Sequence, residues 1–163
     1  MSIKISVAII TFNEEKNIKR CINSVSKLAD EIVVVDSLSS DNTCSIAKSL
    51  NATVIDQKFL GHIAQKQLAV DNCKNNWILS LDADEEISEE LEKSIMNLIN
   101  NTLEYDAYSL NRVSFHLGAW IRHGGWYPDK KIRLFNKTKA YWGGYNPHDK
   151  VIVNGNTGHL QGD

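Results

Sequence analysis

Two aspartates follow an apolar run in the middle of the chain. Asp82 and Asp84 come directly after residues 77–81, which have the composition of a buried strand. Residues two apart in an extended chain point the same way, so we expect both carboxylates to converge beyond the strand end. Hard divalent ions such as Mg²⁺ and Mn²⁺ bind carboxylates together with water and phosphate oxygens. The pair is therefore a candidate seat for a metal-bound diphosphate.

The same acids also have a purely structural interpretation. Five glutamates lie between residues 85 and 92, and Ser88 stands where a helix would take its N-cap. Carboxylates in the first turn stabilise the positive end of a helix. Taken alone, the triplet leaves both interpretations open, and its context has to decide between them.

Composition narrows the class of protein. The chain has 163 residues, 42% hydrophobic and 23% charged, which suits one soluble globular domain. A net charge of -2 and the lack of a basic stripe argue against nucleic-acid binding. The three cysteines, Cys21, Cys44 and Cys73, are far apart in helical patterns, as expected of reduced thiols.

Neither a leader peptide nor a membrane span is predicted. The first residues run straight into a strand, and no stretch approaches the roughly 20 apolar residues of a transmembrane helix. We therefore expect a cytoplasmic protein, and the sequence leaves a peripheral contact with a membrane open.

The first hundred residues predict an α/β fold, with a mostly parallel central sheet and helices on both faces. Strands are expected at residues 5–10, 31–36, 52–55 and 77–81. Four helices should alternate with them: one capped by Asn13 and packing Ile18, Cys21, Ile22 and Val25, one starting at Ser40, one at 62–73 with Ala64, Leu68 and Ala69 inward, and one packing Leu91, Ile95, Leu98 and Ile99.

The character of the sequence changes after residue 104. Short strands are expected at 105–112, 131–135, 140–142 and 150–153, giving a mixed or antiparallel region, and residues 113–130 form a long connection of the kind that is often functional. We predict a single domain over 1–163, with a nucleotide-sugar-binding half at 1–104 and an acceptor-side half at 105–163.

Residues at the ends of the predicted strands could bind a nucleotide, because ligands of open α/β sheets bind there. Phe12 offers a base platform, Asp36 an acceptor for a base N–H or ribose hydroxyl, and Lys66 a cation for phosphates. Each has a structural alternative: Phe12 in the core, Asp36 capping a turn, Lys66 solvated on a helix. The glycine patterns of dinucleotide-binding and P-loop proteins do not occur.

The ordered motifs resemble a known family. Residues 9–15 (IITFNEE), 33–37 (VVVDS), 65–66 (QK) and 77–85 (WILSLDADE) are similar to the family 2 glycosyltransferases of GT-A fold. Residues 122–128 (RHGGWYP), 133–135 (RLF) and 142–144 (WGG) are more specifically similar to the bacterial lipopolysaccharide-core β-1,4-glucosyltransferase group.

This resemblance implies an inverting transfer of a sugar from a nucleotide-diphosphate donor, expected to be UDP-glucose, to a lipopolysaccharide-core or other cell-envelope acceptor at the inner face of the bacterial inner membrane. It assigns the nucleoside pocket to Thr11, Phe12, Asn13 and Glu14, the base to Asp36, and the vicinity of the nucleotide to Lys66. Asp82 would contact ribose or metal, and Asp84 would bind Mg²⁺ or Mn²⁺, a Lewis acid for the leaving diphosphate.

The resemblance also implies the remaining roles. Asp149 stands where relatives carry a glutamate and is the candidate general base, with His148 beside it. Arg122, His123 and Trp126 are candidate acceptor or diphosphate contacts. Leu38 departs from the family pattern, which has glycine there; if that turn needs a positive φ, leucine is costly.

Two other functions remain as alternatives. The domain could bind a sugar nucleotide without turnover, or it could be a nucleotidyltransferase. The second would need a glycine-rich loop with a basic residue after the first strand, and residues 11–14 (TFNE) do not provide one.

Overall fold

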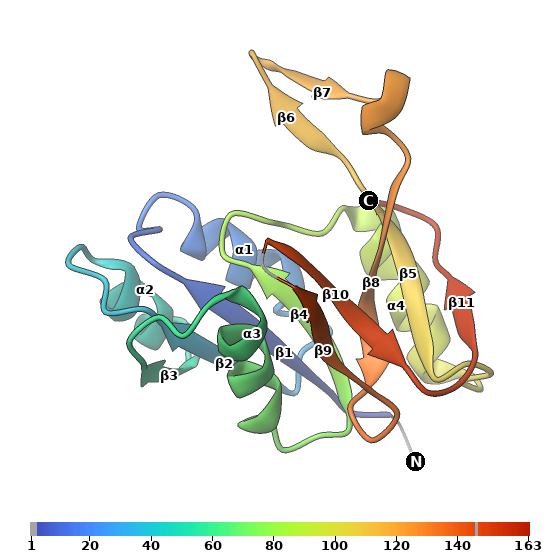
Figure 1. Ribbon diagram of the computed structural model, residues 1–163, viewed down its shortest axis with the longest axis horizontal. Helices are drawn as coiled ribbons and strands as arrows, with labels where there is room; N and C mark the ends of the chain where they lie inside the picture. Colours follow the sequence, from blue (N-terminus) through green and yellow to red (C-terminus); the bar gives the residue numbers. More distant parts are fainter. Residues whose placement is uncertain (1–2, 146) are drawn as a thin grey trace.

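A computed structural model describes residues 3–145 and 147–163. Its centre is a seven-stranded sheet of order β11-β5-β8-β4-β1-β2-β3, in which β8 alone runs against its neighbours (Figure 1). The strands are β1 (Ile5–Thr11), β2 (Glu31–Asp36), β3 (Thr53–Asp56), β4 (Trp77–Asp82), β5 (Ala107–Arg112), β8 (Asp129–Asn136) and β11 (Thr157–His159). The expected α/β class, with a mostly parallel sheet, is confirmed.

Each face of the sheet carries its own hydrophobic core. The helices α1 (Ile18–Val25), α2 (Thr43–Ser49) and α4 (Glu89–Asn100) pack on one face. The other face is covered by α3 (His62–Asp71) and by an antiparallel pair, β9 (Ala140–Tyr145) and β10 (His148–Val153). This second layer brings α3 and β10 over the end of β4, where the predicted site lies (Figure 1).

A small hairpin projects from the body (Figure 1). It consists of β6 (Ser114–His116) and β7 (Ala119–Ile121), followed by a short 3-10 turn at Gly124–Trp126. The long connection predicted at 113–130 is therefore mostly ordered secondary structure. The hairpin strands are only three residues each, too short to stand out as an alternating pattern.

Strong periodic patterns predicted their elements well. The strand expected at 31–36 matches β2, and its last four residues are buried. The helix expected to pack Leu91 and Ile95 is α4, whose N-cap Ser88 accepts a hydrogen bond from the Leu91 amide at 3.1 Å. The cysteines are free, as expected.

Two predicted helix starts are wrong. Asn13 does not cap α1, which begins at Ile18 after Asn17; instead its φ is 52° and its side-chain oxygen accepts from the Ser40 amide at 2.9 Å. Ser40 is thereby held in the loop, and α2 begins at Thr43. Hydrogen bonds thus join the β1–α1 and β2–α2 loops. Local sequence patterns could not predict such contacts between distant segments.

The inward face of α3 was predicted only in part. Ala69 is buried and Leu68 packs against the core as expected, but Ala64 is exposed, whereas Gln65 and Lys66 are buried. Gln65 donates to Ser37 Oγ and to the Gln57 carbonyl, both at 3.1 Å, so its amide group is satisfied inside the fold.

Among the described residues, no helix is long and apolar enough to cross a lipid bilayer.

Leu38 has a φ of 65° and an exposed side chain, so the predicted cost of leucine at this turn applies. We expect Leu38→Gly to raise the free energy of unfolding by about 1 kcal/mol, because glycine adopts this conformation without steric penalty and no buried surface is lost. Leu60→Gly is the control: Leu60 is equally exposed and its φ is not positive, so glycine there should lower stability. Urea unfolding measures both, and the same sign in both variants would contradict the expectation.

Candidate active site

Lys66 is the centre of a buried charge cluster. Its ammonium lies 2.7 Å from Asp149 Oδ2, 3.2 Å from Asp82 Oδ1 and 4.5 Å from the centre of the Trp142 ring, and the residue is 5% exposed. Helix α3, β4, β9 and β10 therefore meet at one cation. The predicted site residues Lys66, Asp82 and Asp149 come together, although they are widely separated in sequence.

Lys66 also sets the protonation of Asp149. Burial acts to raise the pKa of this carboxyl, but the hydrogen bond and charge of Lys66 outweigh it, and the net pKa is lowered. Asp149 is therefore a carboxylate at neutral pH, already paired with an ammonium.

Arg133 is a second buried cation, which the sequence analysis did not assign to the site. It is 4% exposed; its Nη2 lies 2.6 Å from Glu85 Oε1 and 3.7 Å from Asp82 Oδ2, while Nη1 has no partner among the described residues. Glu85 in turn accepts from the Asp82 amide at 2.9 Å. Burial raises the pKa of Glu85, and the charge of Arg133 opposes that rise. The available signal was the motif at residues 133–135 (RLF), which the sequence analysis used only for the family resemblance.

Asp82 ends β4, and Asp84 lies in the turn that follows rather than in the extended chain expected from the sequence. Asp84 is exposed at the strand end, and no described residue pairs with its carboxylate. Asp82 Oδ1 is buried and makes no hydrogen bond, although the Lys66 ammonium is 3.2 Å away. A buried carboxylate oxygen that lacks a hydrogen bond is open to a further cation.

A cavity of about 850 Å³ starts at this pair. It is bounded by β4, β8 and β5 and reaches the projecting hairpin, where Phe115, Trp120 and Arg122 line it. Asp84 and Arg133 line the opposite end. Asp149, Thr11 and Asp36 do not line it, so the cavity occupies the side of the site away from β2.

Asp36 closes the other side of the site at the end of β2. It is buried, and its two oxygens accept from the amide and hydroxyl of Ser39 at 2.7 and 2.6 Å. Ser39 Oγ also accepts from the Asn13 amide at 2.7 Å. The structural interpretation of Asp36, as a cap of the following turn, is thus realised; the turn it holds is the one that faces Asn13.

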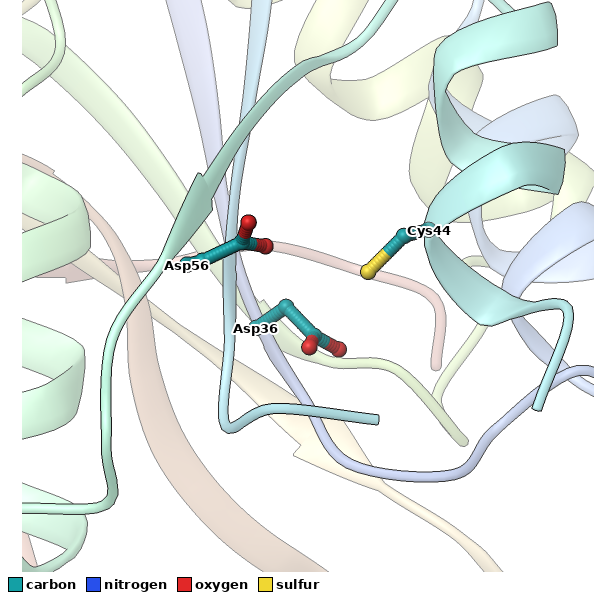
Figure 2. A group of neighbouring side chains, drawn as sticks. All are labelled: Asp36, Cys44 and Asp56. Atoms are coloured by element: carbon teal, nitrogen blue, oxygen red, sulfur yellow. The ribbon is translucent and has the colours of Figure 1, made fainter. Parts of the chain in front are cut away.

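Asp36 also belongs to a group of three possible metal ligands. Figure 2 shows the side chains of Asp36, Cys44 and Asp56 pointing toward one another from β2, α2 and β3, with ligand atoms within 4.8 Å of one another. Burial, followed by Asp36, raises the pKa of the Cys44 thiol to about 11, so the thiol keeps its proton at neutral pH. A protonated thiol is a poor ligand for Mg²⁺ or Mn²⁺, which favour oxygen. The group suits N–H donors better than a hard cation.

The remaining residues of the expected nucleoside pocket lie at the end of β1. Thr11 is buried, and its hydroxyl has no partner among the described residues; Phe12 is 57% exposed rather than in the core. The Glu14 carbonyl accepts from the Asn17 and Ile18 amides, so this residue starts the first turn toward α1.

The residues predicted to contact the acceptor or the diphosphate do not lie together. Arg122 lines the cavity and lies 2.6 Å from Asp163, and that carboxylate raises the pKa of the guanidinium. His123 and Trp126 are exposed and do not line the cavity. His148 is exposed and stacks edge-on against Tyr145, with ring centres 5.1 Å apart, rather than joining the charge cluster beside Asp149.

Fold and site together define an α/β protein with a cluster of buried charges at the carboxyl end of the central strand β4. Residues 6–154 match the family described as Glycosyl transferase family 2, and the chain belongs to that family. An uncharacterized glycosyltransferase of Rickettsia typhi is 41% identical over 156 residues, which cover 93% of this chain and 53% of the relative. The chain thus spans about half the length of the first curated relatives it matches.

More distant relatives carry functional names. The lipopolysaccharide core biosynthesis glycosyltransferase LpsC of Rhizobium meliloti is 27% identical over 163 residues, covering 96% of this chain and 60% of that protein. A crystal structure of S. aureus TarS 1-349 in complex with UDP shares 28% identity at a TM-score of 0.56, over 67% of this chain and 35% of that one.

A further solved structure agrees in fold. Glucosyl-3-phosphoglycerate synthase of Mycobacterium tuberculosis, in complex with Mn²⁺, UDP-glucose and phosphoglyceric acid, matches at a TM-score of 0.56 and 21% identity, over 66% of this chain and 43% of that chain. These structures confirm the expected GT-A fold.

Removing the Lys66 charge should destabilise the protein and reverse the contribution of Asp149 to the pH dependence of its stability. In Lys66→Met, Asp82 and Asp149 lose a buried partner, and we expect about 2 kcal/mol less stability at pH 7. In the native protein the lowered pKa of Asp149 contributes stability above the unfolded value of about 3.9, and this contribution is lost as pH falls through the folded pKa. Without Lys66, burial alone should raise that pKa, so acidification toward pH 4 should recover part of the lost stability.

Urea unfolding between pH 4 and pH 8 measures the effect. Lys93→Met is the matched control, because Lys93 is exposed on α4 and forms no ion pair with any described residue. A constant difference between Lys66→Met and the native protein across this range would contradict the assigned pairing.

Proposed function

We propose that this chain is the catalytic domain of an inverting glycosyltransferase that moves a sugar, glucose in the first instance, from a uridine-diphosphate donor to a lipopolysaccharide-core or similar envelope glycan. The convergence of Asp82, Asp149, Lys66 and Arg133 at the end of β4 carries the proposal. Family membership and the likeness to LpsC support its direction. We place the protein in the cytoplasm, at the inner face of the bacterial inner membrane.

The donor nucleoside is proposed to lie over the ends of β1 and β2. Phe12 offers an exposed aromatic face, and it follows Thr11, whose buried hydroxyl has no partner among the described residues, at the end of β1. The Asp36 group supplies acceptors for the N–H of a base. Asn13 and Glu14 shape the loop that borders this space through backbone and side-chain bonds.

Asp84 and Asp82 are proposed to hold a divalent ion, Mg²⁺ or Mn²⁺, which when bound would offset the negative charge of the leaving diphosphate. Lys66 and Arg133 add fixed positive charge next to Asp82 in a dry environment, where such charge is most effective. The cavity beyond Asp84 is proposed to take the body of the acceptor, with Arg122 at its far end. Because Asp149 does not line this cavity, the reacting hydroxyl must extend past Asp82 to reach that carboxylate.

Asp149 is the proposed general base that takes the proton of the acceptor hydroxyl. Its pairing with Lys66 makes it a weak base in the donor-free protein. An anionic diphosphate beside Asp82 would offer Lys66 another partner, and the hold of the ammonium on Asp149 would then weaken. In this proposal the base gains strength only when donor is bound.

A binding module without turnover is the second candidate. It is favoured by the same ion pair, since a carboxylate that stays bound to Lys66 accepts no proton. Binding and turnover must therefore be measured separately.

Donor binding should depend on Asp84. We expect UDP with Mn²⁺ to raise the melting temperature of the native chain, equivalent to about 2.7 kcal/mol when free UDP is a hundred times its Kd. Asp84→Ala should lose the part of this shift that requires Mn²⁺, whereas Asp71→Ala, an exposed aspartate on α3, should keep it. A full Mn²⁺-dependent shift in Asp84→Ala would remove Asp84 from the metal site.

Turnover should depend on Asp149. Asp149→Asn keeps the shape of the side chain, so UDP binding should persist, while UDP release from UDP-glucose with a core oligosaccharide should fall by about a hundredfold or more. Asp71→Asn serves as the control. If native protein binds UDP with metal and yet releases none from the donor, the binding module is the better description; equal turnover in Asp149→Asn would identify another base.

A further inference from the structure

The hairpin β6–β7 exposes a group of large apolar side chains that nothing else in the described chain covers. Leu117 at its tip is 93% exposed, and Phe115, Trp120 and Trp126 are each at least half exposed. Phe115 and Trp120 pack edge to face, with ring centres 5.1 Å apart, so they form one contiguous apolar surface. Contiguous exposed apolar groups of this size mark contact sites more often than chance exposure.

The hairpin is also separate from the main sheet. Its two strands pair only with each other, as a sheet of their own, and it extends away from the body (Figure 1). A two-stranded ribbon of three residues per strand has little intrinsic stability in water. Burial of its apolar side chains against another surface would therefore stabilise the hairpin.

The segment that carries the hairpin has a net charge opposite in sign to that of the whole chain. Residues 112–131 carry four Lys or Arg and one Asp, a net charge of +3, whereas the whole chain is -2. Arg112 and Lys131 both form ion pairs with Asp129, and Arg122 forms one with Asp163. Lys130 is exposed and forms no ion pair with a described residue. Two histidines, His116 and His123, lie in the same segment. An apolar tip with a cationic base suits an anionic surface.

We propose that the β6–β7 hairpin docks on an anionic lipid surface, with Leu117, Phe115 and Trp120 entering the headgroup region. Tryptophan and other aromatic side chains favour that depth, and basic residues nearby are attracted to anionic lipid. Phe115, Trp120 and Arg122 also line the cavity that begins at Asp84. Docking therefore brings the far end of this cavity to the membrane. The proposal rests on the proposed location at the inner face of the membrane but needs no donor chemistry, so failure of vesicle binding would leave the proposed sugar transfer untouched.

Vesicle binding tests the proposal. The chain should sediment with vesicles of phosphatidylcholine and phosphatidylglycerol at 3:1 and should bind pure phosphatidylcholine about tenfold less. Leu117→Glu should reduce binding to the anionic vesicles at least tenfold, since it places a carboxylate at the inserted tip. Leu60→Glu changes the net charge equally at another exposed leucine, in the loop before α3, and should bind within about twofold of the native chain.

A second variant gives a direct reading of insertion. Anionic vesicles should shift the tryptophan emission of the native chain to the blue, and Trp120→Phe should lose most of that shift while keeping the aromatic pair with Phe115. Circular dichroism shows whether each variant is folded. Equal binding to both vesicle types, equal losses in Leu117→Glu and Leu60→Glu, or an unshifted emission would each overturn the proposal. Light scattering that reports a dimer dissolved by Leu117→Glu would assign the surface to a second copy instead.

Discussion

A lysine buried between two carboxylates holds the candidate site together. Lys66 bonds Asp149 at 2.7 Å and faces Asp82 at 3.2 Å, with the Trp142 ring beneath it. Burying an ammonium without these partners would carry a large desolvation cost. The position of α3 and of the β9–β10 pair therefore depends on charges that come from β4 and β10. The Trp142 indole, which donates to Ser80 Oγ at 3.3 Å, fixes the same layer to the sheet.

The antiparallel β8 explains why this cluster can form. It inserts between β4 and β5, and its alternation places Arg133 on the face that carries Phe135, toward α3 and β9. A parallel neighbour would need a crossover helix, and it would end at the same edge as β4 instead of starting there. Since β8 starts at that edge, its early residues lie beside the Asp82–Glu85 turn. Arg133 thus reaches Glu85 and Asp82 from a strand that belongs to the later part of the chain.

Apolar runs and helical periodicity in the sequence predicted the elements that short-range interactions determine. The unbroken apolar run of β2 and the capped, periodic α4 were correct. The cost expected of leucine at position 38 was conditional on a positive φ, which the structure shows. The orientation of α3 was predictable only in part, because Gln65 and Lys66 are buried beside the apolar Ala69 and Val70, and polar residues point inward only where distant partners satisfy them. The loop bonds between Asn13 and Ser40 have the same origin.

The charge balance at the end of β4 links the fold to its chemistry. Arg133 is matched at short range by Glu85, which leaves Asp82, Asp84 and Asp149 against the single ammonium of Lys66. This arrangement has an excess of two negative charges, partly shielded because Asp84 is exposed. Such an excess raises the energy of the protein, and a divalent cation would offset it. A univalent ion or a further lysine would leave half of it. The same excess repels a free diphosphate, so an anionic donor and a cation would favour each other's binding here, as linkage requires when each lessens the charge that the other meets.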